Sequence, residues 1–185
     1  MVLIFIKILY CLINILIGIY DFSFYRIPNL LLGALLVLYG LCAPFYMSPG
    51  SILSALAVFA IVLVLGLILY ASKIIGGGDA KYFAVASLWA GFSGVVQLFF
   101  IIALVGGGAA IIYLLLRDHV ARLSDGLWAL IQKMEERVPT LQYVWVGSGE
   151  GPENGKRENI SSRMVPYGVA IATGAIIMML YSKTL

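Results

Sequence analysis

The longest stretch without a charged side chain runs from residue 27 to residue 72, between Arg26 and Lys73. These 46 residues far exceed the roughly 20 that one helix needs to cross a hydrocarbon layer of about 30 Å. A turn is therefore expected inside the stretch, and the segment 42–51 (CAPFYMSPGS) supplies it, because proline cannot continue helical hydrogen bonding and glycine relaxes the backbone. The stretch predicts two membrane-spanning helices.

The rest of the chain has the composition of an integral membrane protein. Of its 185 residues, 62% are hydrophobic and only 11% are charged, whereas a soluble domain carries about a quarter charged residues. A second uncharged stretch, 82–116, has its clearest break at 90–94 (AGFSG), which predicts a shorter fourth helix and a full fifth helix. The segment 164–182 predicts a sixth span, and the first apolar run, which lacks the cleavage pattern of a signal peptide, predicts the first.

We therefore expect an all-α polytopic membrane protein with about six transmembrane helices, forming one domain over residues 1–185. Between the fifth and sixth helices, residues 117–138 have apolar positions at helical spacing and predict an amphipathic helix on the membrane surface. The polar segment 147–162 predicts a mobile loop, so that 117–163 forms one cytoplasmic insertion.

The distribution of positive charge predicts the orientation in the membrane. Six spans would place the first, third and fifth connections on one face, and ten of the twelve Lys and Arg residues fall there: Arg26, Lys73, Lys81, Arg117, Arg122, Lys133, Arg137, Lys156, Arg157 and Arg163. Because cytoplasmic loops carry the excess of Lys and Arg, this face is expected inside and both termini outside. The lipid bilayer is thus the expected partner of the chain's surface, and nothing in the charge pattern implies nucleic acid.

Two acids stand apart from the other seven. Seven of the nine Asp and Glu residues lie between positions 118 and 158, which leaves Asp21 and Asp79 alone in the first 117 residues, each at a membrane boundary. An ionisable group at this depth is costly unless it is solvated or paired, so it is a candidate for function. For Asp21 alone, a boundary acid wetted by headgroup water is an equally good interpretation; the two together favour function.

The residues before Asp79 strengthen the case. Gly76, Gly77 and Gly78 disfavour regular helix, permit positive φ and let another backbone approach closely, so they are expected to present the carboxylate on a bendable loop. A second glycine triplet, 106–108, is better explained by close helix contact or a kink.

Two carboxylates on one watery face suggest peptide hydrolysis. Like charges a few ångströms apart cannot both ionise readily, so such a pair holds a shared proton; one partner then acts as base on water while the other donates a proton to the carbonyl. Cys11 and Cys42 form no metal-binding or disulfide pattern and His119 lacks nearby ligands, so we predict no metal site and no cofactor.

Three motifs in order resemble a known family. They are D-x-x-x-x-R-I-P-N at 21–29, G-G-G-D-A-K at 76–81 and R-M-V-P-Y-G-V-A-I-A-T-G at 163–174. Together they look like the type IV prepilin peptidases, GxGD-type aspartic membrane peptidases, and in particular their minimal form in tight-adherence (Flp-type) pilus systems. The resemblance implies that Asp21 and Asp79 are the catalytic pair. It also implies a substrate, a prepilin or pseudopilin whose short basic leader is removed at the cytoplasmic face of the inner membrane, just before its apolar helix.

The remaining motif residues have two interpretations each. Pro28 and Asn29 have the chemistry of a helix start, which favours structure over substrate contact. Arg26 and Lys81 can hold the charge of the acid pair or meet lipid phosphates. Three residues at the mouth of the last span can wall the cleft: Pro166, Tyr167 and Gly168. Tyr167 is equally well explained as an interfacial aromatic anchor.

Two other classes of protein fit parts of the pattern. A proton-coupled transporter would use paired acids as a relay, although its acids are expected nearer the middle of the membrane. A noncatalytic assembly protein of a pilus or secretion system would need the fold but neither carboxylate. The cysteine-rich insertion of larger prepilin peptidases has no counterpart between Asp21 and Pro28, so we predict peptidase activity and leave N-methylation open.

Overall fold

The computed structural model describes residues 2–115 and 167–181 and is all helical in these ranges. Five helices follow one another: α1 (Val2–Phe24), α2 (Asn29–Tyr46), α3 (Pro49–Ala71), α4 (Gly77–Leu115) and α8 (Tyr167–Tyr181). The predicted amphipathic helix, the 147–162 loop, His119 and Pro166 lie outside the described residues. The all-α prediction is confirmed for the described part of the chain.

Four of the helices are long and apolar enough to cross a membrane: α1, α2, α3 and α4. Their outer faces carry exposed aliphatic side chains; Val37, Leu53 and Leu104 are each more than 60% exposed. Surfaces of this kind are stable against lipid. The long apolar helices and their exposed aliphatic faces confirm the prediction of a membrane protein.

The turn expected in 42–51 is confirmed and is short. α2 continues through Pro44 to Tyr46, and α3 begins with Pro49 in its first turn. Ser48 caps α3, because its hydroxyl accepts a hydrogen bond from the Ser51 amide at 3.2 Å.

The count of six spans is not borne out in the described residues. The expected fourth and fifth spans belong to one element, α4, in which only Gly91 leaves the helical backbone, at φ 65° and ψ −175°. This residue lies inside the predicted break at 90–94. The expected sixth span is α8, a helix of 15 residues, which is shorter than an ordinary crossing.

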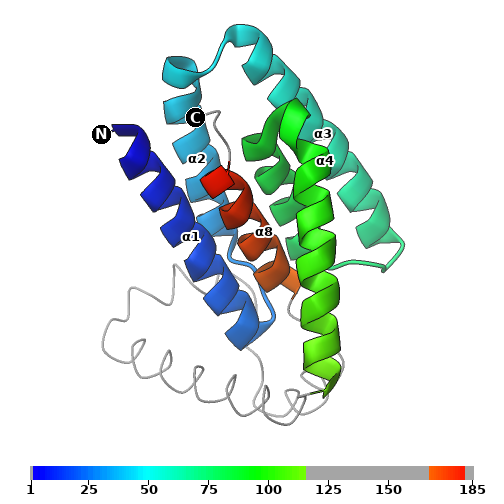
Figure 1. Ribbon diagram of the computed structural model, residues 1–185. Helices are drawn as coiled ribbons and strands as arrows, with labels where there is room; N and C mark the ends of the chain where they lie inside the picture. Colours follow the sequence, from blue (N-terminus) through cyan, green and yellow to red (C-terminus); the bar gives the residue numbers. More distant parts are fainter. Residues whose placement is uncertain (1, 116–166, 182–185) are drawn as a thin grey trace.

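At Gly91 the chain turns back on itself, so α4 consists of a first arm, residues 77–90, and a second arm, residues 92–115 (Figure 1). The rings of Phe83 and Phe99 meet at 5.9 Å between centroids. In a straight helix residues with this spacing would be about 24 Å apart along the axis. A left-handed conformation at this position is open to glycine at little cost, which explains why the reversal falls there.

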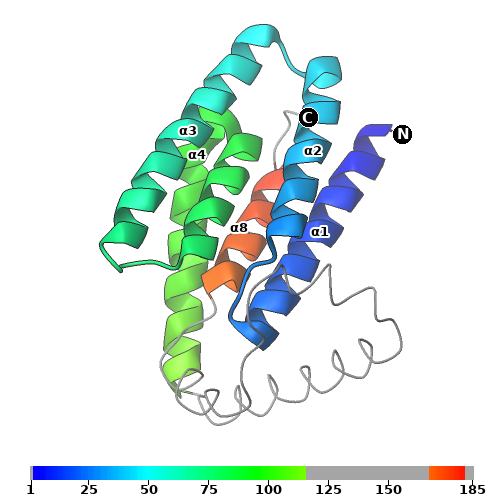
Figure 2. The same ribbon diagram turned by 180° about the vertical axis from the view of Figure 1, so that it is seen from behind.

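Helix α8 lies inside the bundle, against α1 on one side and α4 on the other (Figures 1 and 2). Small residues permit this placement. A Cβ at Gly174 would come within 2.5 Å of Ile102, and one at Gly18 would touch Ala172 at 3.4 Å. Close approach through small side chains is the usual way that helices pack in membranes, where burial of apolar surface supplies little driving force.

The helices alternate in direction, so that their ends gather in two groups. The end of α1, both ends of the α3–α4 connection and the starts of α2 and α8 lie at one end of the bundle (Figures 1 and 2). The first and third connections therefore share a face, as the charge pattern predicts. Both Asp21 and Asp79 are at this end, which we call the acid end.

Candidate active site

Two helices end at the acid end in the same way, each followed by a residue of positive φ. Tyr25 follows α1 at φ 53°, and its amide donates to the Asp21 carbonyl oxygen at 2.8 Å. Lys73 follows α3 at φ 57°, and the amides of Lys73 and Ile74 donate back to carbonyls of the last turn. A left-handed residue after the last turn satisfies free carbonyls and ends the helix, so both connections begin at defined points.

Asp21 lies in the last turn of α1 and is only 4% exposed. Its carboxylate accepts hydrogen bonds from the backbone amides of Gly168 and Val169, in the first turn of α8. These amides have no partner inside their own helix, and the helix dipole there favours a negative charge. Asp21 therefore caps a helix from nearly the other end of the chain.

Gly168 has a specific reason to be glycine. A Cβ at this position would lie 2.7 Å from both Cγ and Oδ2 of Asp21, closer than any real contact allows. The predicted role of Gly168 as a wall of the cleft becomes more definite, because this residue touches one of the two acids directly.

Asp79 is held by its own helix. It is the third residue of α4, and its carboxylate accepts a hydrogen bond from the amide of Gly76, the residue just before the helix. The Ala80 amide in turn donates to the Gly76 carbonyl at 3.0 Å. This is one half of a capping box, in which a side chain of the first turn reaches back to the amide before the helix; the other half is missing because Gly76 has no side chain.

The two carboxylates are close enough to interact electrostatically, and the charge of Asp79 acts on Asp21. Asp79 is half-buried and Asp21 is buried. Oδ2 of Asp21 has no hydrogen-bond partner among the described residues. A buried carboxylate oxygen without a partner is costly and is well placed to receive a water molecule or a ligand.

The first glycine triplet is not the bendable loop that its composition suggests. Gly77 and Gly78 belong to the first turn of α4, and neither has a positive φ. Their lack of a side chain serves close packing instead. A Cβ at Gly77 would lie 3.2 Å from the Tyr70 ring, and one at Gly78 would lie 3.3 Å from Ile27.

Asn29 and Lys81, from the first two motifs, meet in the structure. The Lys81 ammonium donates to Oδ1 of Asn29 at 3.3 Å, which links the start of α2 to the first arm of α4. The expected helix start is confirmed: Pro28 is the N-cap residue of α2, but no side-chain hydrogen bond caps the helix there. Arg26 is exposed in the α1–α2 connection.

Tyr167 is the first residue of α8, at the acid end, and its side chain lies against the second arm of α4. It is 39% exposed, its ring is 6.4 Å from that of Phe83, and a Cβ at Gly106 would lie 3.2 Å from its hydroxyl. The close helix contact expected for the second triplet is therefore confirmed at Gly106. Gly107 and Gly108 meet nothing within 4 Å in the described structure.

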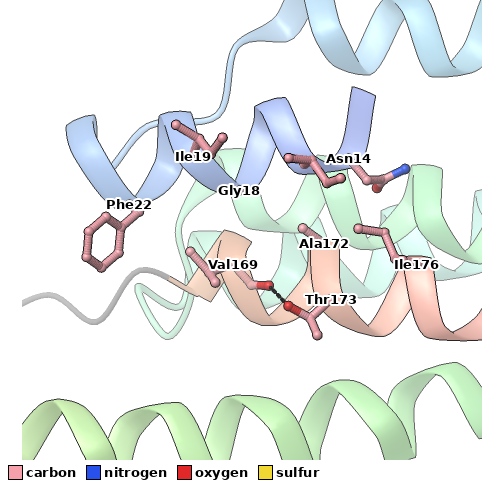
Figure 3. Close-up of a pocket in the computed structure, with 9 residues that line it drawn as sticks. Asn14, Gly18, Ile19, Phe22, Val169, Ala172, Thr173 and Ile176 are labelled. Carbon is pink, nitrogen blue, oxygen red and sulfur yellow. Dashed lines mark hydrogen bonds between the residues drawn. The ribbon is translucent and has the colours of Figure 1, made fainter. Parts of the chain in front are cut away.

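An apolar groove of about 290 Å³ runs between α1 and α8 (Figure 3). Gly18 and Ala172 line it together with larger side chains that include Ile19 and Ile176. One end of the groove is at Phe22 and Val169, which are the chain neighbours of Asp21 and Gly168. The groove thus leads away from the acid pair along the bundle.

Two polar residues near the acids escaped the interpretation of the sequence. Asn14 and Tyr82 are both fully buried, and the Tyr82 hydroxyl donates to Oδ1 of Asn14. The available signal was spacing: Asn14 lies two helical turns before Asp21, and Tyr82 lies one turn after Asp79. An amide in the middle of an apolar run is itself unusual.

Comparison with known protein families matches residues 8–111 to the type IV leader peptidase family. The match covers more than half of the chain, including Asp21, the first glycine triplet and Asp79. The chain belongs to the type IV leader peptidase family. Membership implies a peptidase, and together with the apolar helices it indicates a multi-pass membrane protein. Comparison with the curated proteins gave no match, and comparison with the solved structures gave none.

Proposed function

We propose that this protein is an aspartic endopeptidase of the membrane that removes the short basic leader from prepilins or pseudopilins. The observation that carries the proposal is the electrostatic interaction between Asp21 and Asp79, which lie on separate helices at one end of the bundle. Each carboxylate is anchored by backbone amides, and Oδ2 of the buried acid has no partner in the described residues. Family membership supports the reaction class, and the resemblance of the motifs supports the Flp-type substrate.

In the proposed reaction the two carboxyl groups share one proton. The ionised group takes a proton from a water molecule, and the oxygen of that water attacks the carbonyl carbon of the scissile peptide bond. The protonated group donates to the carbonyl oxygen as the C–O double bond opens. Collapse of the tetrahedral intermediate breaks the C–N bond, and the proton taken from water passes to the leaving amine. A hydroxyl proton of the intermediate returns to the other carboxylate as the carbonyl re-forms, which restores the starting state of the pair.

The groove between α1 and α8 supports this substrate class. A bond cut just before an apolar helix must lie at the acid pair while the helix continues into the bilayer. The groove starts beside Asp21, and its α1 positions from Phe22 to Asn14 span about 12 Å, or roughly two helical turns. Gly18 and Ala172 let another helix approach closely.

The proposed orientation follows from charge. The acid end carries Arg26, Lys73 and Lys81, so we place it at the cytoplasmic face of the inner membrane. With the two arms of α4 and α8 counted as crossings, the chain passes through the bilayer six times and both termini lie outside.

The test is cleavage of candidate precursors by purified protein in lipid, with the product identified by mass. Asp21→Asn and Asp79→Asn should each lower the cleavage rate by roughly a thousandfold, because acid–base groups typically contribute 10²–10⁴-fold. Asp125→Asn, the same change in the segment 117–138, is the matched control and should retain the rate of the unchanged protein. Cleavage that persists in a folded Asp21→Asn or Asp79→Asn variant would refute the acid pair.

A further inference from the structure

Helix α1 and the first arm of α4, which carry the two acids, contact each other through a narrow row of side chains. Most of the packing of α1 is against α8, and most of that of α4 is against α3 and α8. We call the residues that join α1 to α4 the α1–α4 seam: Tyr10, Asn14, Tyr82 and Trp89.

Two contacts between side chains make up the seam. Far from the acid end, the rings of Tyr10 and Trp89 lie 4.6 Å apart between centroids, tilted by 50°. Nearer to it, the Tyr82 hydroxyl donates to Oδ1 of Asn14. The next contact along the same two helices is the electrostatic one between Asp21 and Asp79.

The order of these contacts defines a register. Positions 10 and 14 of α1 contact positions 89 and 82 of α4, and Asp21 and Asp79 interact electrostatically beyond them, as expected for antiparallel helices. Asn14 and Asp21 are seven residues apart and Tyr82 and Asp79 are three apart, so in each helix the pair lies on one face. A shift of one helix along the other would break the hydrogen bond and displace the two carboxylates from each other.

The hydrogen bond is directional and fully enclosed. Asn14 and Tyr82 are each 0% exposed, and Nδ2 of Asn14 donates to the Tyr10 carbonyl at 2.8 Å within α1. Both polar atoms of the amide are therefore bonded, one to its own helix and one across the seam. A buried bond of this kind specifies one arrangement of two helices more sharply than apolar contact, which tolerates sliding.

We propose that Asn14 and Tyr82 are positioning residues, which fix the register of α1 against α4 and thereby the separation of Asp21 and Asp79. The inference rests on the proposed function, since it assigns these residues a role in the reaction of the acid pair. Two carboxyl groups that flank one water and one peptide bond must be held to a fraction of an ångström.

The experiment is steady-state cleavage of a prepilin precursor by reconstituted Tyr82→Phe, which keeps the ring and removes the hydroxyl. We expect kcat to fall by roughly tenfold to a hundredfold, because misplacement of reacting groups by about 1 Å costs up to 10²-fold, while KM stays within about twofold. Tyr39→Phe is the matched control: Tyr39 is also buried, its hydroxyl contacts Met47 within the α2 region, and its loss should leave kcat unchanged.

A double variant, Asn14→Leu with Tyr82→Phe, separates positioning from stability. It leaves neither polar group without a partner, so its thermal midpoint should recover while kcat stays low. If Tyr82→Phe alone does not accumulate, the double variant carries the test by itself. A folded variant with the kcat of the unchanged protein, or recovery of kcat together with stability in the double variant, would overturn the proposal.

Failure of this inference is distinguishable from failure of the proposed function. If Asp21→Asn and Asp79→Asn abolish cleavage but Tyr82→Phe does not lower kcat, the acid pair stands and the positioning role falls. If the acid variants retain cleavage, the proposed function itself is refuted.

Discussion

The two glycine triplets have the same sequence and different structural roles. In the triplet 76–78 every glycine has a close neighbour, and Gly76 lies against the carboxylate of Asp79. In the triplet 106–108 only Gly106 has close neighbours, which are the side chains of Tyr167 and Ala170. Gly107 and Gly108 meet nothing within 4 Å in the described structure. Neither triplet uses positive φ. Glycine in this bundle therefore matters where something must approach closely, and the approach is set by tertiary structure.

The strongest test of this view is Gly168→Ala, at a glycine of the acid end that lies outside both triplets. The added methyl would lie 2.7 Å from Asp21 Cγ and Oδ2, so the buried carboxylate or the start of α8 must move. We expect cleavage to fall roughly a hundredfold, the cost of moving a reacting group by about 1 Å.

The measurement for Gly168→Ala is the cleavage rate in lipid, with accumulation in the membrane as the check on folding. Ala170→Gly, a change of the same size two residues further along α8, is the control and should lose far less activity. A Gly168→Ala protein with full activity would show that the contact with Asp21 has no catalytic importance.

A smaller loss is expected for Gly76→Ala. Its methyl would lie 2.9 Å from Oδ2 of Asp79, but this is the end of a side chain that can rotate away. We expect a loss of about tenfold in the cleavage rate, which corresponds to about 1.4 kcal/mol of barrier. An effect equal to that of Gly168→Ala would contradict the distinction between a buried and a half-buried carboxylate.

The smallest effect on cleavage is expected in the second triplet, where the substitutions should raise the stability of the protein rather than lower it. Gly107→Ala and Gly108→Ala place methyl groups in open space inside the second arm of α4, where alanine favours helix by about 0.5–1 kcal/mol over glycine. Thermal unfolding in detergent should show equal or higher midpoints, with unchanged cleavage. Loss of cleavage after either change would contradict the distinction between the first triplet, where every glycine has a close neighbour, and Gly107 and Gly108, which have none within 4 Å in the described structure.

Much of the fold was predictable because it depends on local chemistry. The prolines of 42–51 and the glycine of 90–94 marked a turn and a break that the structure places at residues 47–48 and at Gly91. The expected fourth and fifth helices belong to one element, α4, because a single glycine of positive φ, Gly91, reverses the chain between its two arms. The lengths of the apolar runs alone could not show this.

The two acids of the site were predictable from the sequence, but the residues that hold them in place were not. Asp21 and Asp79 stood out because acids are rare in an apolar chain. The amides that hold Asp21 come from Gly168 and Val169, far along the sequence, and no local pattern indicates such a contact. Asn14 and Tyr82 were missed for the same reason: an asparagine and a tyrosine in apolar runs acquire meaning only when the helices are paired. Propensity predicts a loop at Gly77 and Gly78, and tertiary packing places them in a helix.

The most direct test of the central claim is chemical cross-linking between the positions of the two acids in the membrane. In a protein with both native cysteines replaced by alanine, Asp21→Cys and Asp79→Cys should be joined in high yield by a short bifunctional thiol reagent, with the linked peptides identified by mass. Asp21→Cys paired with Ser48→Cys, at the opposite end of the bundle, should remain unlinked. Each single cysteine reacting with a monofunctional reagent while the 21–79 pair fails to link would contradict the account, because the two carboxylates would then not meet.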